Sequence, residues 1–202
     1  MNWKTLFSFG AVTLFAPAIL SASTLSGDFT ADDNVELIPI SILGLSQVTI
    51  QTTSFATGGF EPVLTLYDPS GNLLFQDANG GTEPSGCGAR ATDPVSGFCL
   101  DAFIQGILNV PGTYTLALTE WDNIPSGPTL ADGFPQTGNG NFTGPEFTGN
   151  PGSFLLFNGA QRTSDWALQI DVAPIPEPGS LGLALSAGFV AIALRRKLLP
   201  GK

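Results

Sequence analysis

Residues 63–75 read Val-Leu-Thr-Leu-Tyr-Asp-Pro-Ser-Gly-Asn-Leu-Leu-Phe, and this stretch is the clearest indication of the fold. Two apolar runs, residues 63–67 and 73–76, flank the turn Asp-Pro-Ser-Gly at residues 68–71. Proline suits the second position of a tight turn, and glycine accepts the backbone conformations that such turns require. The stretch therefore predicts a β-hairpin.

Three further segments alternate apolar and polar residues, which is the pattern of a half-buried strand. They are residues 47–52, 113–120 and 165–171. The side chains expected on their inward faces are Val48, Ile50, Thr52, Tyr114, Leu116, Leu118, Trp166, Leu168 and Ile170.

Less regular apolar runs predict additional strands at residues 35–42, 98–104 and 154–157. Residues 110–113 fit a type II turn, because Gly112 tolerates a positive φ. About eight short strands joined by turns, with no convincing helix, are typical of an antiparallel all-β fold. We therefore expect one β-sandwich or jelly roll over residues 24–173, a length that suits a single domain.

The first 23 residues have the three regions of a secretory signal peptide. Lys4 precedes an uncharged and mostly apolar run at residues 6–20, and the small residues Ser21, Ala22 and Ser23 follow. Cleavage by signal peptidase after Ala22 or after Ser23 fits equally well. A permanent first membrane helix is the alternative, but Pro17 and the small residues favour removal. We expect export from the cytoplasm.

The last segment, residues 174–202, has the parts of a membrane tail. Its uncharged apolar run at residues 179–194 predicts a single transmembrane helix, whose core of residues 181–194 would be about 21 Å long. A bilayer core is about 30 Å thick, so this helix suits a temporary anchor. A basic cluster at residues 195–197 should stay in the cytoplasm, which leaves the body in the periplasm. A buried helix of a soluble domain is the alternative.

Pro176, Glu177 and Pro178 precede the apolar run, and proline geometry keeps this stretch extended. With the cluster Arg195, Arg196 and Lys197 behind it, the tail resembles the PEP-CTERM sorting signal of exopolysaccharide-producing Gram-negative bacteria. The resemblance implies that an exosortase in the inner membrane cuts near residues 176–178 and passes the body to the cell surface or the extracellular matrix of a biofilm. Residues 198–202 continue past the point where such tails usually end.

A second resemblance concerns the body. Residues 63–75 and 111–118 resemble paired strands of the bacterial pre-peptidase C-terminal β-sandwich. The segment 121–142, with Leu-Ala-Asp-Gly-Phe at residues 130–134, is similar to PEP-CTERM bodies of unknown activity. These resemblances imply a fold and a location, and they offer no catalytic residues.

Charge excludes one class of partner. All 17 acidic residues lie between Asp28 and Glu177, where only Arg90 and Arg162 are basic, so this part carries a formal charge of −15. Such a body repels nucleic acid and anionic lipid and attracts cations.

Cys87 and Cys99 are the only cysteines, and they lie among glycines and prolines. In an exported protein, an isolated pair across a turn-rich segment predicts a structural disulfide, which would stabilise the fold by about 3 kcal/mol. Free thiols are the alternative. A metal site would need further Cys or His ligands nearby, and the chain has no histidine.

Residues 121–151 form a segment rich in glycine and proline, which is longer than an ordinary connection between strands. Its aromatic residues Trp121, Phe134, Phe142 and Phe147 could stack on sugar rings, so bacterial exopolysaccharide is a candidate partner. The alternative, which we favour, is that these rings fasten the segment to the sandwich.

Asp28, Asp32, Asp33 and Glu36 lie close together in the sequence, and an all-oxygen cluster suits calcium. No EF-hand spacing or aspartate-glycine repeat accompanies them, so solvated acids are the alternative. Asp122-Asn123 with Asp132 forms a fainter candidate. No other cofactor is expected.

Enzyme activity is not expected. With no histidine and no lysine between Asp28 and Glu177, the Ser-His-Asp, Cys-His and Ser-Lys arrangements are impossible in the body. Two of the acidic residues could still act as a glycosidase-like pair, but the sequence does not identify which two. We therefore predict a surface or matrix protein with a structural or adhesive role. The alternative is a polysaccharide-binding module, with or without the help of calcium.

Overall fold

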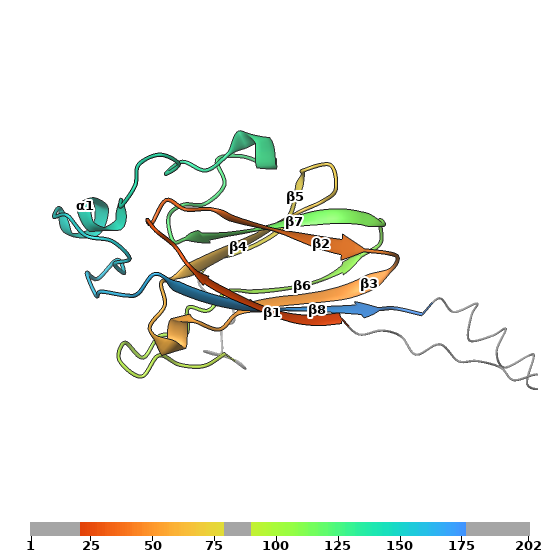
Figure 1. The fold of residues 1–202 in the computed structure, drawn as a ribbon, viewed down its shortest axis with the longest axis horizontal. Helices are drawn as coiled ribbons and strands as arrows, with labels where there is room; N and C mark the ends of the chain where they lie inside the picture. Colours follow the sequence, from red (N-terminus) through yellow and green to blue (C-terminus); the bar gives the residue numbers. More distant parts are fainter. Residues whose placement is uncertain (1–20, 79–89, 177–202) are drawn as a thin grey trace, which may run out of the picture.

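The structure, a computed structural model, describes residues 21–78 and 90–176. Its strands form two antiparallel sheets of four strands that pack face to face (Figure 1). Sheet A contains, in order, β1 (Ser21–Asp28), β8 (Asp165–Pro174), β3 (Ser46–Thr52) and β6 (Phe103–Leu108). Sheet B contains, in order, β2 (Glu36–Ile42), β7 (Gly112–Glu120), β4 (Pro62–Tyr67) and β5 (Leu73–Ala78). The predicted β-sandwich is confirmed.

Strand pairing is nested. β1 pairs with β8, β2 with β7, β3 with β6 and β4 with β5. Successive pairs alternate between the two sheets, as in a long hairpin that has been rolled up, which is the jelly-roll arrangement. The hairpin predicted from residues 63–75 is β4–β5, at the tip of that long hairpin, and Gly71 takes the positive φ of 84° that its turn requires.

The core lies between the sheets and consists of the inward faces predicted from alternation. Val48, Leu116 and Leu168 are completely buried there, each from a different strand. At one end of the core, the stacked rings of Phe29 and Phe60 lie 4.9 Å apart between centroids. Each fully buried side chain of this size stabilises the fold by about 1.5–3 kcal/mol.

Two strand predictions differ from the structure, and one strand was not predicted. Residues 98–104 contribute only their end to β6, and residues 154–157 form an isolated bridge between Leu155 and Gln161 instead of a strand. Phe154 has a φ of +52°, which a strand does not allow. β1 was not predicted, because its sequence Ser-Ala-Ser-Thr-Leu-Ser-Gly-Asp carries almost no apolar signal.

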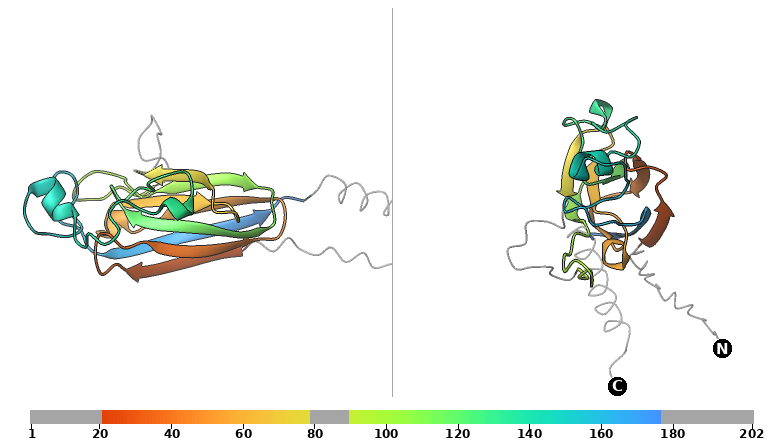
Figure 2. Two further views of the ribbon diagram at one scale, coloured as in Figure 1. Left: turned by 90° about the horizontal axis from the view of Figure 1, so that it is seen from above. Right: turned by 90° about the vertical axis from the view of Figure 1, so that its left-hand side faces the viewer.

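The two ends of the sandwich differ (Figure 2). At one end β1 begins and β8 ends, with Ser21 opposite Val172, and the short turns at residues 43–45, 68–72 and 109–111 lie beside them. We call this end the terminal pole.

The opposite end carries the long connections, and we call it the loop pole (Figure 1). They are residues 29–35, 53–61, the described part of the β5–β6 connection (residues 90–102), and residues 121–164, of which residues 128–130 reach back and bond to the turn at residues 68–72. The last of these contains α1 (Thr143–Thr148), a short helix that the sequence did not predict.

Several predictions lie outside the described residues. They are most of the signal peptide, the basic cluster, the apolar run at residues 179–194, Glu177, Pro178 and Cys87. Within the described ranges, no helix is long and apolar enough to span a bilayer.

Candidate functional site: the loop pole

The long connection at residues 121–164 is fastened to the sandwich by Asp32. This side chain is fully buried, and its carboxylate accepts hydrogen bonds from the amides of Thr143 and Phe154, both at 2.9 Å. The hydroxyl of Thr143 donates to the same carboxylate. Both oxygens of Asp32 are therefore occupied by the connection that it holds.

Asp33 performs the same role one residue later. Its carboxylate accepts hydrogen bonds from the amides of Gly138 at 2.9 Å and Gly140 at 3.0 Å. The side chain of Asn123 donates to the Asp33 carbonyl at 3.2 Å and accepts from the amide of Gln136 at 3.1 Å. Two adjacent acids of the β1–β2 connection thus order the glycine-rich segment.

The other acids of the predicted calcium cluster lie elsewhere. Asp28 faces Asp165 across the β1–β8 pair, and a hydrogen bond shared by the two carboxyl groups raises the pKa of Asp28. Glu36 is exposed at the start of β2. The structure does not bring Asp28, Asp32, Asp33 and Glu36 together, and in residues 21–78 and 90–176 no three acidic or cysteine side chains are grouped as metal ligands.

The fainter calcium candidate, Asp122-Asn123 with Asp132, also consists of residues with separate structural roles. Asp122 shares a hydrogen bond with Glu146, and this contact raises the pKa of Glu146 to about 7. Asp132 accepts hydrogen bonds from the amide and hydroxyl of Thr129, at 2.9 and 2.8 Å, which caps a short 3-10 helix at Leu130–Asp132.

The four predicted aromatic residues are not equivalent. Phe142 is buried at the start of α1, which agrees with the interpretation that the rings fasten the segment. Trp121, Phe134 and Phe147 are half-buried, so part of each ring faces solvent. They do not stack on one another.

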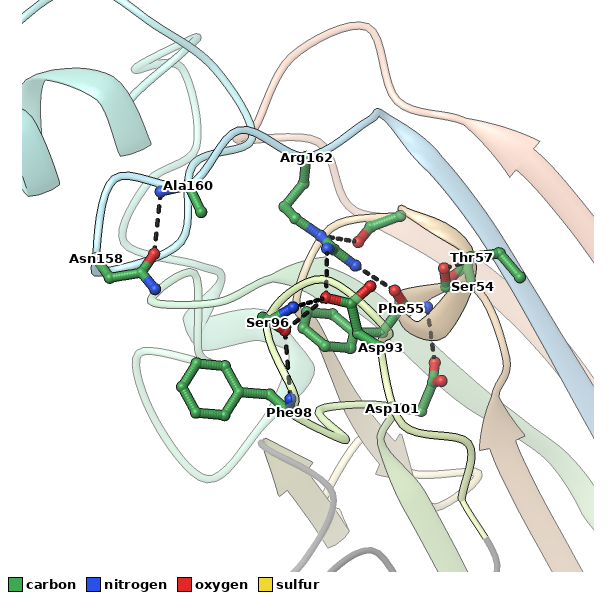
Figure 3. Close-up of polar contacts among 11 residues, drawn as sticks. Ser54, Phe55, Thr57, Asp93, Ser96, Phe98, Asp101, Asn158, Ala160 and Arg162 are labelled. Atoms are coloured by element: carbon green, nitrogen blue, oxygen red, sulfur yellow. Dashed lines mark hydrogen bonds and ion pairs between the residues drawn. The ribbon is translucent and has the colours of Figure 1, made fainter.

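Arg162 links three connections of the loop pole (Figure 3). Its guanidinium forms a buried salt bridge with Asp93 at 3.1 Å and donates to the carbonyls of Gly59, at 2.9 Å, and Phe55. The guanidinium also lies 4.2 Å from the centroid of the Phe55 ring. Asp93 additionally accepts hydrogen bonds from the amide and hydroxyl of Ser96. Every functional nitrogen of Arg162 is therefore in use.

Asp101 holds the short turn at Phe55 from the side opposite Arg162. Its carboxylate accepts hydrogen bonds from the hydroxyl of Thr52 at 2.9 Å and from the amide of Phe55 at 3.1 Å. Because Phe55 also contacts Arg162, the same short turn is held from both sides (Figure 3).

Two buried glutamates, one directly before β4 and one at the end of β7, are less completely bonded. Glu61 and Glu120 are 3% and 1% exposed, and the Oε2 atom of each lacks a hydrogen-bond partner. Burial raises the pKa of Glu61 to about 7. The pKa of Glu120 is raised well above its ordinary value by burial and then by the charges of Asp32 and Glu61, against a smaller opposing effect of Arg162.

Sequence reasoning did not identify these glutamates, although one signal was present. The alternation of Tyr114, Leu116 and Leu118 continues to Glu120, which places a carboxylate on an inward face. The Arg162–Asp93 pair had no comparable signal, because its members lie 69 residues apart in the chain.

Cys99 lies on the β5–β6 connection and is not a free thiol. Its predicted partner, Cys87, is outside the described residues, so the pairing of these two cysteines stays a prediction.

No protein-family model matches this chain, and no curated protein is significantly similar to it.

Proposed function

We propose that this protein is an exported surface or matrix protein with a structural or adhesive role, tethered to the membrane by its terminal pole. Signal peptidase would remove the first segment, and an exosortase would cut near Pro176, Glu177 and Pro178. The loop pole would then face away from the membrane and meet the partner.

The observation that supports this proposal is that both ends of the described chain lie at the terminal pole. β1 begins beside the end of β8, and Ile175 donates a backbone hydrogen bond to Leu45 at 2.8 Å. The described chain therefore ends at the terminal pole, three residues before the apolar run at 179–194 begins. Three residues span at most about 11 Å, so a tail in the bilayer would keep this pole at the membrane surface.

The surface of the terminal pole suits that position. Leu43 is 93% exposed at the tip of one turn, and Ile107 and Val110 are more than half exposed near another. Residues 43–45 and 109–111 carry no charge. Apolar side chains can enter the boundary region of a bilayer, whereas the many acids of the body would be repelled by anionic headgroups.

Fractionation of a Gram-negative host that has an exosortase tests the proposal. The full chain would carry a C-terminal epitope, and a second version would have residues 176–178 replaced by three alanines. A matched control would have residues 198–200 replaced by alanines. We expect the wild type and the control to lose the epitope and reach the surface or medium, while the motif variant keeps the epitope in the membrane fraction.

Intact-mass measurement of the surface form locates both cuts. Accumulation of the uncut chain in the cytoplasm would contradict the proposed function, and so would surface delivery of the motif variant with its epitope still attached.

A polysaccharide-binding module is the second candidate. It is supported by Trp121, Phe134 and Phe147, which are partly exposed in the long connection of the loop pole. Titration of the full chain with the host's exopolysaccharide should give saturable heat that is lost on Trp121→Ala, whereas Phe157→Ala, which removes an exposed ring outside this set, should leave it unchanged. Absence of heat with the wild type would remove this candidate.

A further inference from the structure

The inference concerns two turns of the terminal pole, residues 43–45 and 109–111, which we call the tip turns. The first joins β2 to β3, and the second joins β6 to β7. Strand pairing frames them on both sides, because Ile42 lies opposite Gly112 in sheet B, and the residue after the first turn lies opposite the residue before the second in sheet A. The tip turns therefore cross between the sheets side by side, at the end where β8 finishes (Figure 1).

The tip turns carry no charge and present apolar side chains to solvent. Leu43 is 93% exposed, and Val110 is 54% exposed. Asn109 has the only polar side chain among the residues of the two turns. In a body with a formal charge of −15, exposed apolar tips without charge indicate a surface that meets an apolar partner.

A groove of about 340 Å³ adds apolar surface beside the tip turns. It lies between the second tip turn and the turn at residues 68–72, and its lining includes Pro69, Leu74 and Val110. The two turns are in close contact, because a side chain added at Gly112 would come within 2.7 Å of the Pro69 Cγ atom. The apolar surface of the terminal pole is therefore larger than the two tips alone.

The tip turns lie where the tail leaves the fold. The amide of Ile175 donates a hydrogen bond to the carbonyl of Leu45 at 2.8 Å. Only residues 176–178 separate Ile175 from the apolar run at residues 179–194. Because three residues span at most about 11 Å, lipid that received this run would begin within reach of Leu43.

We propose that the tip turns are a membrane-contact surface, in which Leu43 and Val110 enter the boundary region of a bilayer with zwitterionic headgroups. Apolar side chains are stabilised in that region because they leave water. Zwitterionic lipid is favoured because Asp68 lies at the edge of the groove and anionic headgroups repel an acidic body. The inference rests on the tether of the proposed function.

The consequence is an orientation that lasts only as long as the tail is in place. Two tips bury too little apolar surface to hold the body on a bilayer by themselves. An inserted tail would keep them at the lipid surface at a high effective concentration, so that even a weak contact forms. The loop pole would then face away from the membrane until the tail is cut, and the contact would end with the cut.

Quenching of tryptophan fluorescence by brominated lipid tests the contact. The purified full chain, with Trp3→Phe to remove the tryptophan of the first segment, is reconstituted into phosphatidylcholine vesicles with or without bromine on the acyl chains. Leu43→Trp and Val110→Trp each place a reporter in one tip turn. We expect brominated lipid to remove most of the emission that each variant adds, and we expect that emission to be shifted to shorter wavelength.

Val95→Trp is the matched control, because Val95 is 90% exposed on the β5–β6 connection of the loop pole. The emission that it adds should be the same with and without bromine. A second arm replaces part of the phosphatidylcholine by phosphatidylglycerol. Quenching at residue 43 should then weaken, and NaCl should restore it because salt screens the repulsion.

Flotation of the vesicles separates this inference from the proposed function. A chain that does not float with the vesicles would contradict the proposed tether, and this inference with it. A chain that floats but shows no added quenching in either tip variant would overturn this inference alone, as expected if the tip turns meet a protein instead of lipid. Equal quenching in Val95→Trp would also overturn it, and undiminished quenching in phosphatidylglycerol would overturn the preference for zwitterionic headgroups.

Discussion

Arg162 joins three connections of the loop pole through its guanidinium. Its replacement by methionine would leave Asp93 buried without its cation and the Phe55 and Gly59 carbonyls without a donor. Removing one member of a buried pair typically costs about 3–5 kcal/mol. We expect Arg162→Met to lower the free energy of unfolding by that amount, as measured by urea denaturation.

The double variant Arg162→Met/Asp93→Asn is the control for this prediction. Because the uncompensated charge is gone, its loss should be smaller than the sum of the two single losses. Strictly additive losses would contradict the coupling that the salt bridge implies.

At the terminal pole, the Asp68 carboxylate should make part of the protein's stability depend on pH. A hydrogen bond from the Asn72 side chain, helped by amides of the turn, lowers the pKa of Asp68 below its ordinary 3.8. A carboxylate with a lowered folded pKa stabilises the protein above its unfolded pKa, and this contribution disappears as the pH falls through the folded pKa. The stability difference between the wild type and Asp68→Asn should therefore be constant near neutral pH and shrink in acid below 3.8.

Urea denaturation at a series of pH values measures this difference. Ser70→Ala, which alters the same turn without a titrating group, should differ from the wild type by an amount independent of pH. A difference for Asp68→Asn that persists unchanged in acid would rule out the assigned role of the carboxylate.

At the residue scale, the sequence predicted what local chemistry determines. The turn at residues 68–71 and the positive φ of Gly71 follow from proline and glycine alone. The partners of Asp32 and Arg162 could not be predicted in this way. Thr143 lies more than 100 residues from Asp32 in the chain, and Gly59 lies more than 100 residues from Arg162.

At the scale of elements, we expect the hydrogen bonds of Asp33 to keep the long connection ordered. Asp33→Ala would free the amides of Gly138 and Gly140 while leaving the core strands intact. We expect hydrogen exchange of these two amides to accelerate and proteolysis to concentrate near them, with amides of β3 as protected as before.

The matched control for that experiment is Asp132→Ala, which removes the cap of the short 3-10 helix in the same connection. It should loosen residues near Leu130 and leave Gly138 and Gly140 protected. Equal protection of these glycines in the wild type and Asp33→Ala would refute the role of Asp33.

Most strands could be predicted because they are half-buried, and a half-buried strand shows alternation. β3 and β7 were predicted to within one residue of their observed bounds, and β8 was predicted three residues short at its end. β1 was not predicted because it is an edge strand built largely from Ser, Thr and Gly, which show no apolar alternation. It is held in the sheet by its backbone pairing with β8.

At the scale of the whole molecule, the excess of negative charge predicts a salt effect. Self-repulsion among acids destabilises the compact state, and salt screens it over about 10 Å at 0.1 M. With a chelator present, the Tm at pH 7 should rise by several degrees between low and moderate NaCl. The rise should diminish at pH 4, where many carboxyls are protonated, and a Tm indifferent to NaCl at pH 7 would contradict the prediction.

The overall class of the fold was predictable from the strands, but the nesting of the pairs was not. Alternation indicates which face of a strand is buried and does not identify the neighbouring strand. Contacts such as Thr24 with Gln169 join residues near the two ends of the described chain, and only the assembled sheets reveal them.

The pairing of β1 with β8 has a consequence for the order of events during synthesis. A polypeptide threaded across a membrane from its N-terminus delivers β1 first and β8 last. The hairpin β4–β5 can close early, but the outermost pair has to wait until the final strand has emerged. If the protein is exported as proposed, its two sheets cannot be completed during transit, and the chain would remain unfolded enough to be translocated until β8 emerges.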